Sequence, residues 1–322
     1  MNMDTARILV VGAGVNGSLC AVGLYNAGED VKVLARGKHY EDLRDTGIII
    51  EDPFKNTRTV TKVPVIDRLD PQDVYDYILV IVRKNQVPDL LPVLAENRSP
   101  NVVFMVNNPS GPEEMIRALG RERVMLGFVF GAGRREGSVI RAIGGAGSSM
   151  GSTPFGELDG SITPRLTRLV KLLRRADFSV GTSRNITDYL ATHAAMVAPL
   201  AGFLIQRGYD PASLKRYTAA DLGLLVDAMR EVLDVLPTAG FQIVPGGMVV
   251  LKIIPRFLLV AGLRAALPSR FMEVGAMYHI SQAPDEIHQL GVELMALVDK
   301  SGLPVPALRA CLRQAEEKAG QA

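Results

Sequence analysis

Three glycines near the N-terminus, Gly12, Gly14 and Gly17, have the spacing of a turn that binds the pyrophosphate of a dinucleotide. Gly12 permits a tight turn, Gly14 lets the backbone approach the pyrophosphate, and Gly17 lets the following helix pack close to the preceding strand. Backbone N–H groups at the start of that helix, around Val15 and Asn16, would face the anionic phosphates. The spacing alone is weak evidence, because an ordinary flexible loop can also carry it.

The elements around the glycines supply the missing context. Ile8–Val11 is a short β-branched run typical of a buried parallel strand, and 18–26 is a helical stretch that Gly28 ends. Val31–Leu34 then reads as a second strand. Strand, glycine turn, helix and strand in this order form a βαβ unit, which favours a dinucleotide site over a flexible loop.

The end of the second strand predicts which dinucleotide binds. Sites for NAD usually place Asp or Glu there, but this strand continues as Ala35-Arg36-Gly37-Lys38. A guanidinium can bind a 2′-phosphate through a planar fork, whereas a carboxylate would repel it. We therefore expect NADP(H), bound with the help of Arg36 and Lys38; the alternative is a solvated arginine at a strand end.

Composition excludes several classes of protein. The 322 residues are enough for two domains, and a net charge of +2 without a basic, aromatic-rich run gives no reason to expect nucleic acid. With Cys20 and Cys311 as the only cysteines, neither a disulfide framework nor a Cys-rich metal site is available. No charged leader precedes the first strand, and the apolar stretch 243–267 contains Lys252, Pro255, Arg256 and Arg264. We expect a cytoplasmic protein without a membrane span or a metal.

Alternating strands and helices continue to about residue 182. The predicted elements are short strands or a hairpin within 46–66, strands at 77–82, 102–106, 124–130, 139–143 and 178–180, helices at 87–96 and 163–175, and a turn at 131–137. Arg83 and Asn107 follow the ends of two of these strands. Because ligands of doubly wound sheets bind beyond the carboxyl ends of the strands, both residues are candidates for the same crevice as the glycine turn.

From Asn185 onward the pattern is helical, with prolines between the segments. The predicted helices are 185–206, 218–237, 246–266, 270–280, 284–300 and 305–318. The chain therefore reads as an α/β Rossmann-type domain, residues 1–182, followed by an all-helical domain, residues 183–322, for substrate binding and possible dimerisation. A small-molecule substrate would lie in the cleft between them.

Over nearly its whole length the chain resembles the ketopantoate reductases (2-dehydropantoate 2-reductases). The resemblance lies in the segments ILVVGAGVNG, VKVLARGKH, GAGRREGSVI, GELDG, MREVLDV and SGLPVP, and in the turn at Asn107. It implies NADPH as the cofactor and hydride transfer to the ketone of a 2-oxo acid. It also implies a lysine proton donor from the helical domain.

The cofactor half of the resemblance is retained. Arg36 matches the arginine that binds the 2′-phosphate, Asn107 matches the turn asparagine, and Gly133 falls where the backbone approaches the cofactor. Glu286 matches a glutamate near the cofactor, and Arg83 stands where the family often has lysine. Without the resemblance, each polar residue could be an ordinary strand end or helix surface.

The substrate half is not retained. His193 replaces the family lysine, Val197 and Ala198 replace two asparagines, and Val274 falls near the serine that holds the substrate carboxylate. Each missing hydrogen bond to a buried polar group costs on the order of 1–3 kcal/mol, which argues against ketopantoate as the substrate. His193 could donate the proton in place of lysine, or it could be a neutral histidine packed between helices.

Two functional classes remain open. In the first, the protein is an NADPH-dependent reductase of a carbonyl or imine, with a larger and more apolar substrate. In the second, it has lost catalysis and binds NADP(H) as a sensor or partner module. Retention of a histidine at the position of the lysine favours the enzyme.

Overall fold

The chain forms two compact units, one built on sheets and one on helices. The computed structural model describes residues 5–128, 131–147 and 152–319. The first unit comprises Met1–Val106 and Pro112–Ile186, and the second comprises Asn107–Gly111 and Thr187–Ala322. The predicted fold class, an α/β nucleotide-binding type of domain followed by a helical one, is confirmed. The short segment that follows Val106 groups with the helical unit, so the units are not simply consecutive in sequence.

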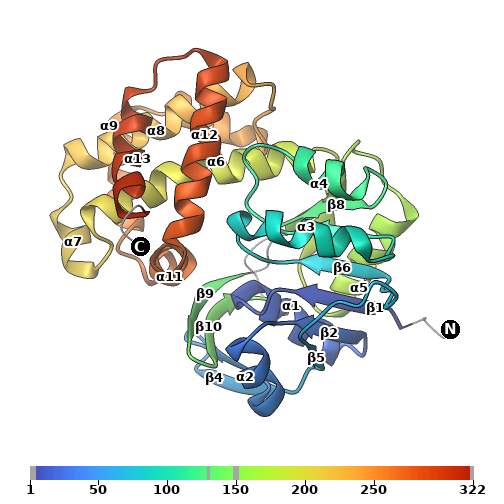
Figure 1. Cartoon of the computed structure of the whole chain (residues 1–322). Coiled ribbons are helices and arrows are strands. Elements are labelled where there is room, and N and C mark those ends of the chain that lie inside the picture. The colour runs from blue at the N-terminus through green and yellow to red at the C-terminus, as the bar shows by residue number, and fades with distance from the viewer. Residues whose placement is uncertain (1–4, 129–130, 148–151, 320–322) are drawn as a thin grey trace. The chain divides into compact units, whose positions relative to one another are not determined.

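A large, mostly parallel sheet forms the centre of the first unit (Figure 1). Its strands are β1 (Arg7–Val11), β2 (Asp30–Leu34), β5 (Val65–Ile66), β6 (Tyr77–Val80), β7 (Val102–Phe104), β8 (Val124–Gly127), β11 (Thr153–Glu157) and β12 (Val180–Thr182). They are arranged in the order β12-β11-β8-β7-β6-β1-β2-β5, and only the pair β8–β11 is antiparallel. β1, β6 and β7 are almost entirely buried, which explains their continuous apolar runs.

The strand order reverses direction between β1 and β6. From β1 the chain adds β2 and β5 on one side, and it then returns to add β6, β7 and β8 on the other. In open parallel sheets such a reversal leaves a crevice at the carboxyl ends of the two central strands. The glycine turn follows β1 at this point, as the sequence predicts.

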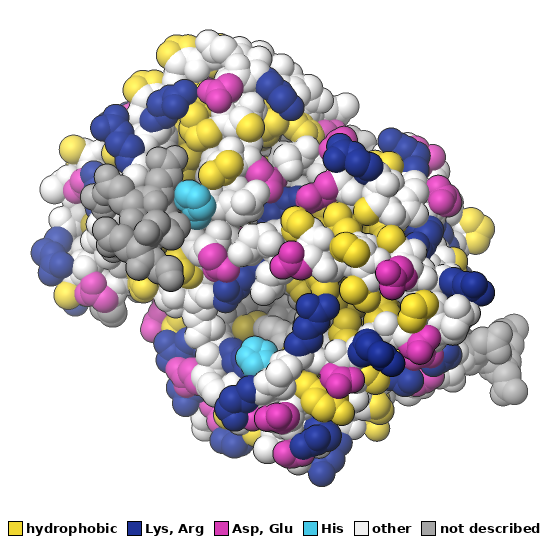
Figure 2. All heavy atoms as spheres, in the orientation of Figure 1, with side chains coloured by type: hydrophobic (Ala, Val, Ile, Leu, Met, Phe, Trp, Pro, Cys, Tyr) yellow, Lys and Arg dark blue, Asp and Glu magenta, His cyan; other side chains and the backbone are white. Residues whose placement is uncertain are grey.

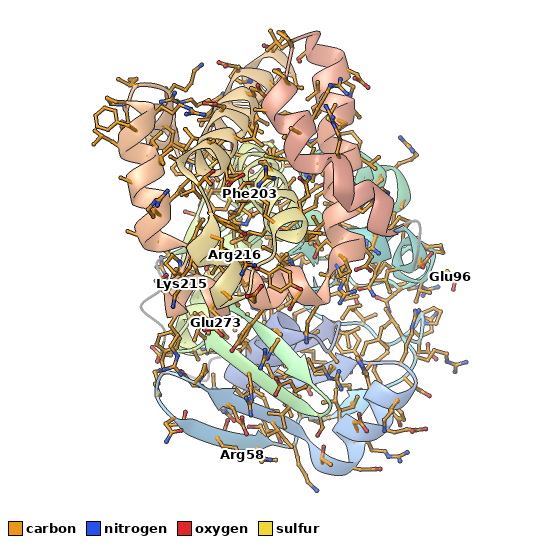
Figure 3. All side chains as sticks on the ribbon, turned by 90° about the vertical axis from the view of Figure 1, so that its left-hand side faces the viewer. Arg58, Glu96, Phe203, Lys215, Arg216 and Glu273 are labelled. Carbon is orange, nitrogen blue, oxygen red and sulfur yellow. The ribbon has the colours of Figure 1, made fainter. Side chains whose placement is uncertain are left out.

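A second sheet covers the helix that follows the glycine turn. Its strands are β3 (Ile48–Asp52), β4 (Thr57–Thr61), β9 (Gly131–Glu136) and β10 (Val139–Gly144), in the order β4-β3-β10-β9. Helix α1 (Val15–Asn26) contacts strands of both sheets, which explains why it is apolar on nearly every face. The predicted hairpin within 46–66 is confirmed as β3 and β4; Arg58 of β4 is labelled on this sheet in Figure 3.

Several predicted boundaries in the first unit are wrong. Residues 131–136, expected as a turn, form strand β9, because they pair along their length with β10. β8 ends at Gly127, and residues 129 and 130 of the predicted strand lie outside the described part of the chain. The last strand is shifted from 178–180 to 180–182, and β11 is not predicted at all, since Pro154 and Gly156 weaken its strand signal.

Helices complete the first unit. They are α2 (Lys38–Thr46), the 3₁₀ turn η1 (Lys84–Gln86), α3 (Val87–Glu96), α4 (Glu113–Leu119) and α5 (Pro164–Arg175). Thr163 caps the N-terminus of α5, where its hydroxyl accepts from the Leu166 N–H, and the helix buries one strongly apolar face. α2 and α4 were missed, because each is short and buries few side chains.

The second unit is a helical cluster. Its helices are α6 (Ile186–Arg207), α7 (Pro211–Arg216), α8 (Ala219–Thr238), the 3₁₀ segment η2 (Gly246–Lys252), α9 (Arg256–Ala266), α10 (Arg270–Met272), the π-helical turn η3 (Glu273–Met277), α11 (Tyr278–Gln282), α12 (Pro284–Ser301) and α13 (Pro306–Ala319). Phe203 is fully buried among these helices, whereas Lys215 and Arg216 of α7 are exposed (Figure 3).

One predicted helix of this unit is wrong. Residues 246–266, expected as a single helix, form η2 and α9, whose axes differ by 114°. Pro255 explains the break, because its ring removes a helical hydrogen bond and restricts the residue before it.

Helix α6 is long and apolar enough to cross a membrane by length and composition. In the structure 67% of the 18-residue apolar stretch of this helix is buried inside the protein. η2 and α9 pass the same test only when taken together as one bent span. The apolar surface of α6 is thus already used by the core of its own unit.

Candidate functional site

The glycine turn has the geometry that a bound pyrophosphate requires. Gly12 has a φ of +108°, and a Cβ at this position would lie 2.2 Å from the Ile81 carbonyl oxygen beyond β6. A Cβ on Gly17 would lie 1.9 Å from the carbonyl oxygen of Gly12, so helix and turn touch through backbone. At Gly14, by contrast, a Cβ would find no heavy atom of the described residues within 4 Å. Gly12 and Gly17 are therefore needed for packing, whereas Gly14 borders open space.

The start of α1 is held by protein contacts. The Ser18 N–H donates to the Gly14 carbonyl at 2.9 Å, which closes the first helical turn. The Asn16 side chain accepts from the Gly131 N–H at 2.9 Å, and the partly buried Val15 packs on β10. Asn16 therefore ties the helix start to β9, and its backbone N–H, like that of Val15, lies in the first turn, where phosphate binding is expected.

Cationic side chains follow the end of β2. Arg36 is exposed, and no hydrogen bond or ion pair engages its side chain within the part of the chain that the structure describes. Lys38, 81% exposed, pairs with Asp42 at 3.1 Å across one turn of α2. The residues that directly follow β2, Ala35 to Lys38, include no carboxylate, whereas NAD sites usually carry one there.

The loop after β6 contains a buried cation that was not predicted. Arg83 is partly buried at the start of η1, where its N–H donates to the Gln86 side chain. Next to it, Lys84 is 3% exposed and forms an ion pair with Glu114 of α4. A buried lysine is uncommon without such a partner, so the pair locks this loop beside the glycine turn.

Gly133 has a structural reason to be glycine. It lies in β9 opposite Ala142, and a Cβ would come within 2.2 Å of the Arg141 carbonyl oxygen. The close contact between β9 and β10 explains this glycine without a cofactor. Its role in cofactor binding stays a prediction.

In the second unit, Asn107 and Glu286 meet directly. The Asn107 side-chain amide donates to Glu286 Oε1 at 3.1 Å, and Glu286 is almost fully buried in the first turn of α12. The other oxygen, Oε2, lies 3.2 Å from Nε2 of His279, an ion-pair distance without the angles of a hydrogen bond. Two candidates that are 179 residues apart thus belong to one polar cluster.

His193 lies beside this cluster, on α6. Burial and, to a smaller extent, the charge of His279 lower the pKa of the His193 imidazole to about 4. Its ring is parallel to that of Tyr189, with 6.5 Å between the centroids. His193 therefore lies near the side of the helical unit that carries Asn107 and Glu286, but as a neutral ring at neutral pH.

The positions of the missing substrate groups are apolar. Ala198 and Val274 are fully buried, and Val197 is partly buried against the helical core. Nothing at these three positions can donate a hydrogen bond from its side chain.

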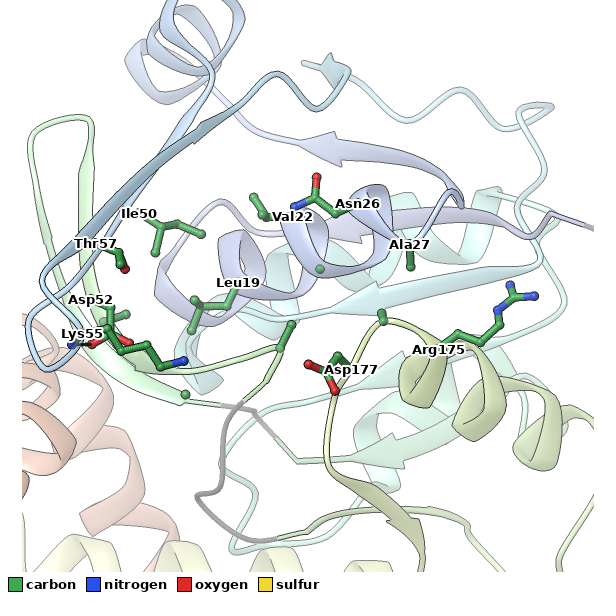
Figure 4. Close-up of a pocket in the computed structure, with 15 residues that line it drawn as sticks. Leu19, Val22, Asn26, Ala27, Ile50, Asp52, Lys55, Thr57, Arg175 and Asp177 are labelled. Carbon is green, nitrogen blue, oxygen red and sulfur yellow. Dashed lines mark hydrogen bonds between the residues drawn. The ribbon is translucent and has the colours of Figure 1, made fainter.

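A separate groove of about 350 Å³ lies in the first unit, beside α1 (Figure 4). Leu19, Ile50, Lys55, Arg175 and Asp177 are among its lining residues, and none of the predicted cofactor residues is. Among the described residues, no group of three or more His, Cys, Asp or Glu side chains is arranged to hold a metal. On the face shown in Figure 2, basic side chains are interspersed with acidic ones.

Arg135 and His39 were not predicted as site residues. The Arg135 guanidinium donates to the Ala13 carbonyl in the glycine turn and to His39 Nδ1 in the first turn of α2. Only the pairing of β9 with β10 brings Arg135 to this place, so local sequence offered no signal beyond the unusual Arg134-Arg135 pair.

Part of the chain matches known proteins in sequence. Residues 8–160 match the family described as ketopantoate reductase PanE/ApbA. The 2-dehydropantoate 2-reductase of Pyrococcus horikoshii is 29% identical over 153 residues, 47% of this chain and 48% of that protein. The enzyme of the same name from Archaeoglobus fulgidus is 30% identical over 177 residues, 54% and 55% of the two chains. The chain thus matches about half the length of these curated relatives.

Solved structures share the fold of the whole chain. D-mandelate dehydrogenase, in a ternary structure with NADH and anilino(oxo)acetate, has a TM-score of 0.77 at 15% identity and covers 98% of both chains. A PanE/ApbA family ketopantoate reductase from Ralstonia eutropha JMP134 has a TM-score of 0.73 at 20% identity and covers 97% of this chain and 99% of that one. At such identities the likeness shows the fold alone. In sequence, residues 8–160, just under half of the chain, are similar to the ketopantoate reductase family.

Proposed function

We propose that the protein is an NADP(H)-dependent oxidoreductase that reduces a carbonyl or imine of a small molecule other than ketopantoate. The observation that carries the proposal is the open approach to Gly14. This glycine lies at the point where the strand order reverses, and Arg36 lies beyond the neighbouring strand. In such an arrangement the pyrophosphate would bind near Gly14 and the 2′-phosphate near Arg36.

The residues of the first unit would bind and orient the cofactor. Backbone N–H groups of Val15 and Asn16 face a pyrophosphate at the N-terminus of α1, and the helix dipole adds to the attraction. Arg36 and Lys38 supply positive charge for a 2′-phosphate, and Arg83 lies at the end of the neighbouring strand β6. When bound, the nicotinamide ring supplies a hydride.

Cofactor choice depends on this chain's own residues. D-mandelate dehydrogenase, a structural neighbour, was solved with NADH, so the fold itself does not select a phosphorylated dinucleotide. Arg36 is the residue that argues for NADP(H), because no carboxylate stands where an unphosphorylated ribose would be held.

The helical unit supports a substrate unlike ketopantoate. Val197, Ala198 and Val274 leave three polar positions of the family without a donor or an acceptor. Asn107 and Glu286 remain, hydrogen-bonded to each other and able to hold one polar group of a substrate. A more apolar carbonyl or imine compound fits this combination better.

A second candidate function is cofactor binding without catalysis. The lowered pKa of His193, about 4, favours it, because a neutral imidazole is a poor proton donor at neutral pH. If the protein is an enzyme, His193 in its neutral form, its neighbour His279 and water are candidate sources of the proton.

Cofactor titration followed by a substrate panel tests the proposal. NADPH and NADH are titrated by fluorescence, and NADPH consumption is then measured with 2-oxo acids, ketones, aldehydes and imines, with ketopantoate included. We expect NADPH to bind about 10- to 100-fold more tightly than NADH, from a charge-assisted bond of about 1.5–3 kcal/mol. Turnover with any compound except ketopantoate supports the enzyme. NADPH binding without turnover supports the second candidate, and binding of neither dinucleotide overturns both. The possible homodimer and the cytoplasmic location stay predictions.

A further inference from the structure

The Arg135 guanidinium is fixed beside the glycine turn. Its Nε donates to the Gly137 carbonyl at 2.7 Å, and Nη1 donates to the Ala13 carbonyl at 3.3 Å. Nη1 also lies 2.7 Å from His39 Nδ1. The side chain is only 13% exposed, so this cation is held in one orientation.

These contacts place Arg135 between two segments that a dinucleotide touches. Ala13 belongs to the turn that approaches the pyrophosphate, and His39 lies three residues after Arg36 at the end of β2. The ribose of a bound adenosine lies between such a turn and such a strand end. Arg135 is therefore on the side of the turn that faces the 2′ position of this ribose.

The charge balance around Arg135 leaves room for an anion. Asp42 Oδ2 is 3.8 Å from Arg135 Nη2, beyond hydrogen-bond distance, and its other oxygen pairs with Lys38. The exposed Glu41 lies on the same helix. Two cations, Lys38 and Arg135, thus share one carboxylate, Asp42, and a 2′-phosphate would neutralise the excess positive charge.

His39 contributes by staying neutral. A guanidinium can only donate, so Nδ1 of His39 accepts and the ring carries its proton on Nε2. Burial and the charge of Arg135 lower the pKa of His39. The imidazole therefore holds the guanidinium without competing with it for a phosphate.

We infer that Arg135, together with Arg36, binds the 2′-phosphate of NADP(H) and so determines cofactor specificity. This inference rests on the proposed function. An exposed arginine loses side-chain freedom and competes with water when it binds an anion, whereas Arg135 is already ordered and partly desolvated. The partly buried guanidinium is the stronger of the two recognition groups.

The test compares the affinities of phosphorylated and unphosphorylated cofactors. NADPH, NADH and adenosine 2′,5′-bisphosphate are titrated against the wild type, Arg135→Gln and Arg135→Lys. Arg141→Gln is the matched control, because Arg141 is an exposed arginine of the adjacent strand that pairs with Glu51 and Glu136. Thermal unfolding of every variant reports whether it is folded.

The expected result is a selective loss. Arg135→Gln should lower the affinity for NADPH and for adenosine 2′,5′-bisphosphate by about 10- to 100-fold, because one charge-assisted bond is lost. Its affinity for NADH should change by less than about threefold. The NADPH affinity of Arg135→Lys should lie between those of the wild type and Arg135→Gln, because lysine keeps the charge but cannot form a bidentate contact. The affinity of Arg141→Gln should equal that of the wild type.

Equal weakening of NADPH and NADH would assign Arg135 to the pyrophosphate or to folding and overturn the inference. No change in either affinity would also overturn it, while leaving the proposed function intact. If the wild type binds neither dinucleotide, both the proposed function and the inference are refuted.

Discussion

Replacing Gly14 by alanine separates cofactor binding from folding. In the structure the added methyl group has no heavy atom of the described residues within 4 Å, and the backbone has an ordinary φ of −77°. Alanine is a poorer residue than glycine at a helix N-cap, but it also lowers the entropy of the unfolded chain. The two effects have similar size, so stability should change by no more than about 1 kcal/mol. The melting temperature should stay within about 4 °C of the wild type.

Cofactor affinity should respond very differently. If the pyrophosphate approaches Gly14 as proposed, the methyl group occupies the space that the phosphate oxygens need. Overpacking of this kind costs about 1–3 kcal/mol, which corresponds to a dissociation constant raised about 5- to 150-fold for NADPH and NADH alike. Equal weakening distinguishes this variant from Arg135→Gln, which should affect the phosphorylated cofactor.

Fluorescence titration with both cofactors, paired with thermal unfolding, measures the two effects on the same samples. Gly262→Ala serves as the control, because Gly262 is an exposed glycine of α9 whose Cβ would also meet nothing within 4 Å among the described residues. This control should bind as the wild type does. A Gly14→Ala protein that is folded and binds both cofactors normally would refute the placement of the pyrophosphate at this turn.

Three further predictions follow from contacts inside each unit. Gly17→Ala should lower stability by about 1–3 kcal/mol or more in chemical denaturation even without cofactor, because its Cβ would lie 1.9 Å from a backbone oxygen of the turn; unchanged stability would contradict the observed packing. Wild-type stability should fall as the pH drops from about 6.5 to about 4, since the lowered pKa of His193 means that the unfolded chain binds the proton first. This loss of unfolding free energy is at most about 3 kcal/mol. Urea titrations should show a smaller loss for His193→Gln over the same pH range, and equal pH profiles for the two proteins would refute the prediction. Glu231→Ala should destabilise the helical unit by about 1–3 kcal/mol in the same assay, because this carboxylate accepts two backbone N–H groups at the start of α13, whereas the nearby exposed Asp234→Ala should have a smaller effect.

Much of the first unit could be predicted from the sequence because its signals are local. The strand before Gly12, the glycine spacing, the helix and the strand that ends at Arg36 all lie within 30 residues. Two requirements for glycine are local: Gly12 has a φ in the left-handed region, and a Cβ on Gly17 would strike the carbonyl oxygen of Gly12. The alternation of apolar strands with helices likewise predicted a parallel sheet, and the prolines of the second half predicted where most of its helices end.

Other features depend on contacts between distant segments. Five of the six residues 131–136 are charged or glycine, which favours a turn, but pairing with β10 satisfies their backbone groups and makes them a strand. The same pairing brings Arg135 to Ala13 and His39, at separations of 122 and 96 residues. Local sequence cannot predict these contacts, because the residues that form them are far apart in the chain.

The polar cluster of the helical unit shows the same limit. From the sequence, Asn107, Glu286 and His193 are each predicted as site residues, because each aligns with a position of the family pattern. Tertiary structure decided that Asn107 groups with the helices, that Glu286 is buried against it, and that His279 lies beside the carboxylate. It also decided the protonation of His193: the residue type predicts a pKa near neutrality, but desolvation by burial disfavours the charged ring, and burial is a property of the packed structure alone.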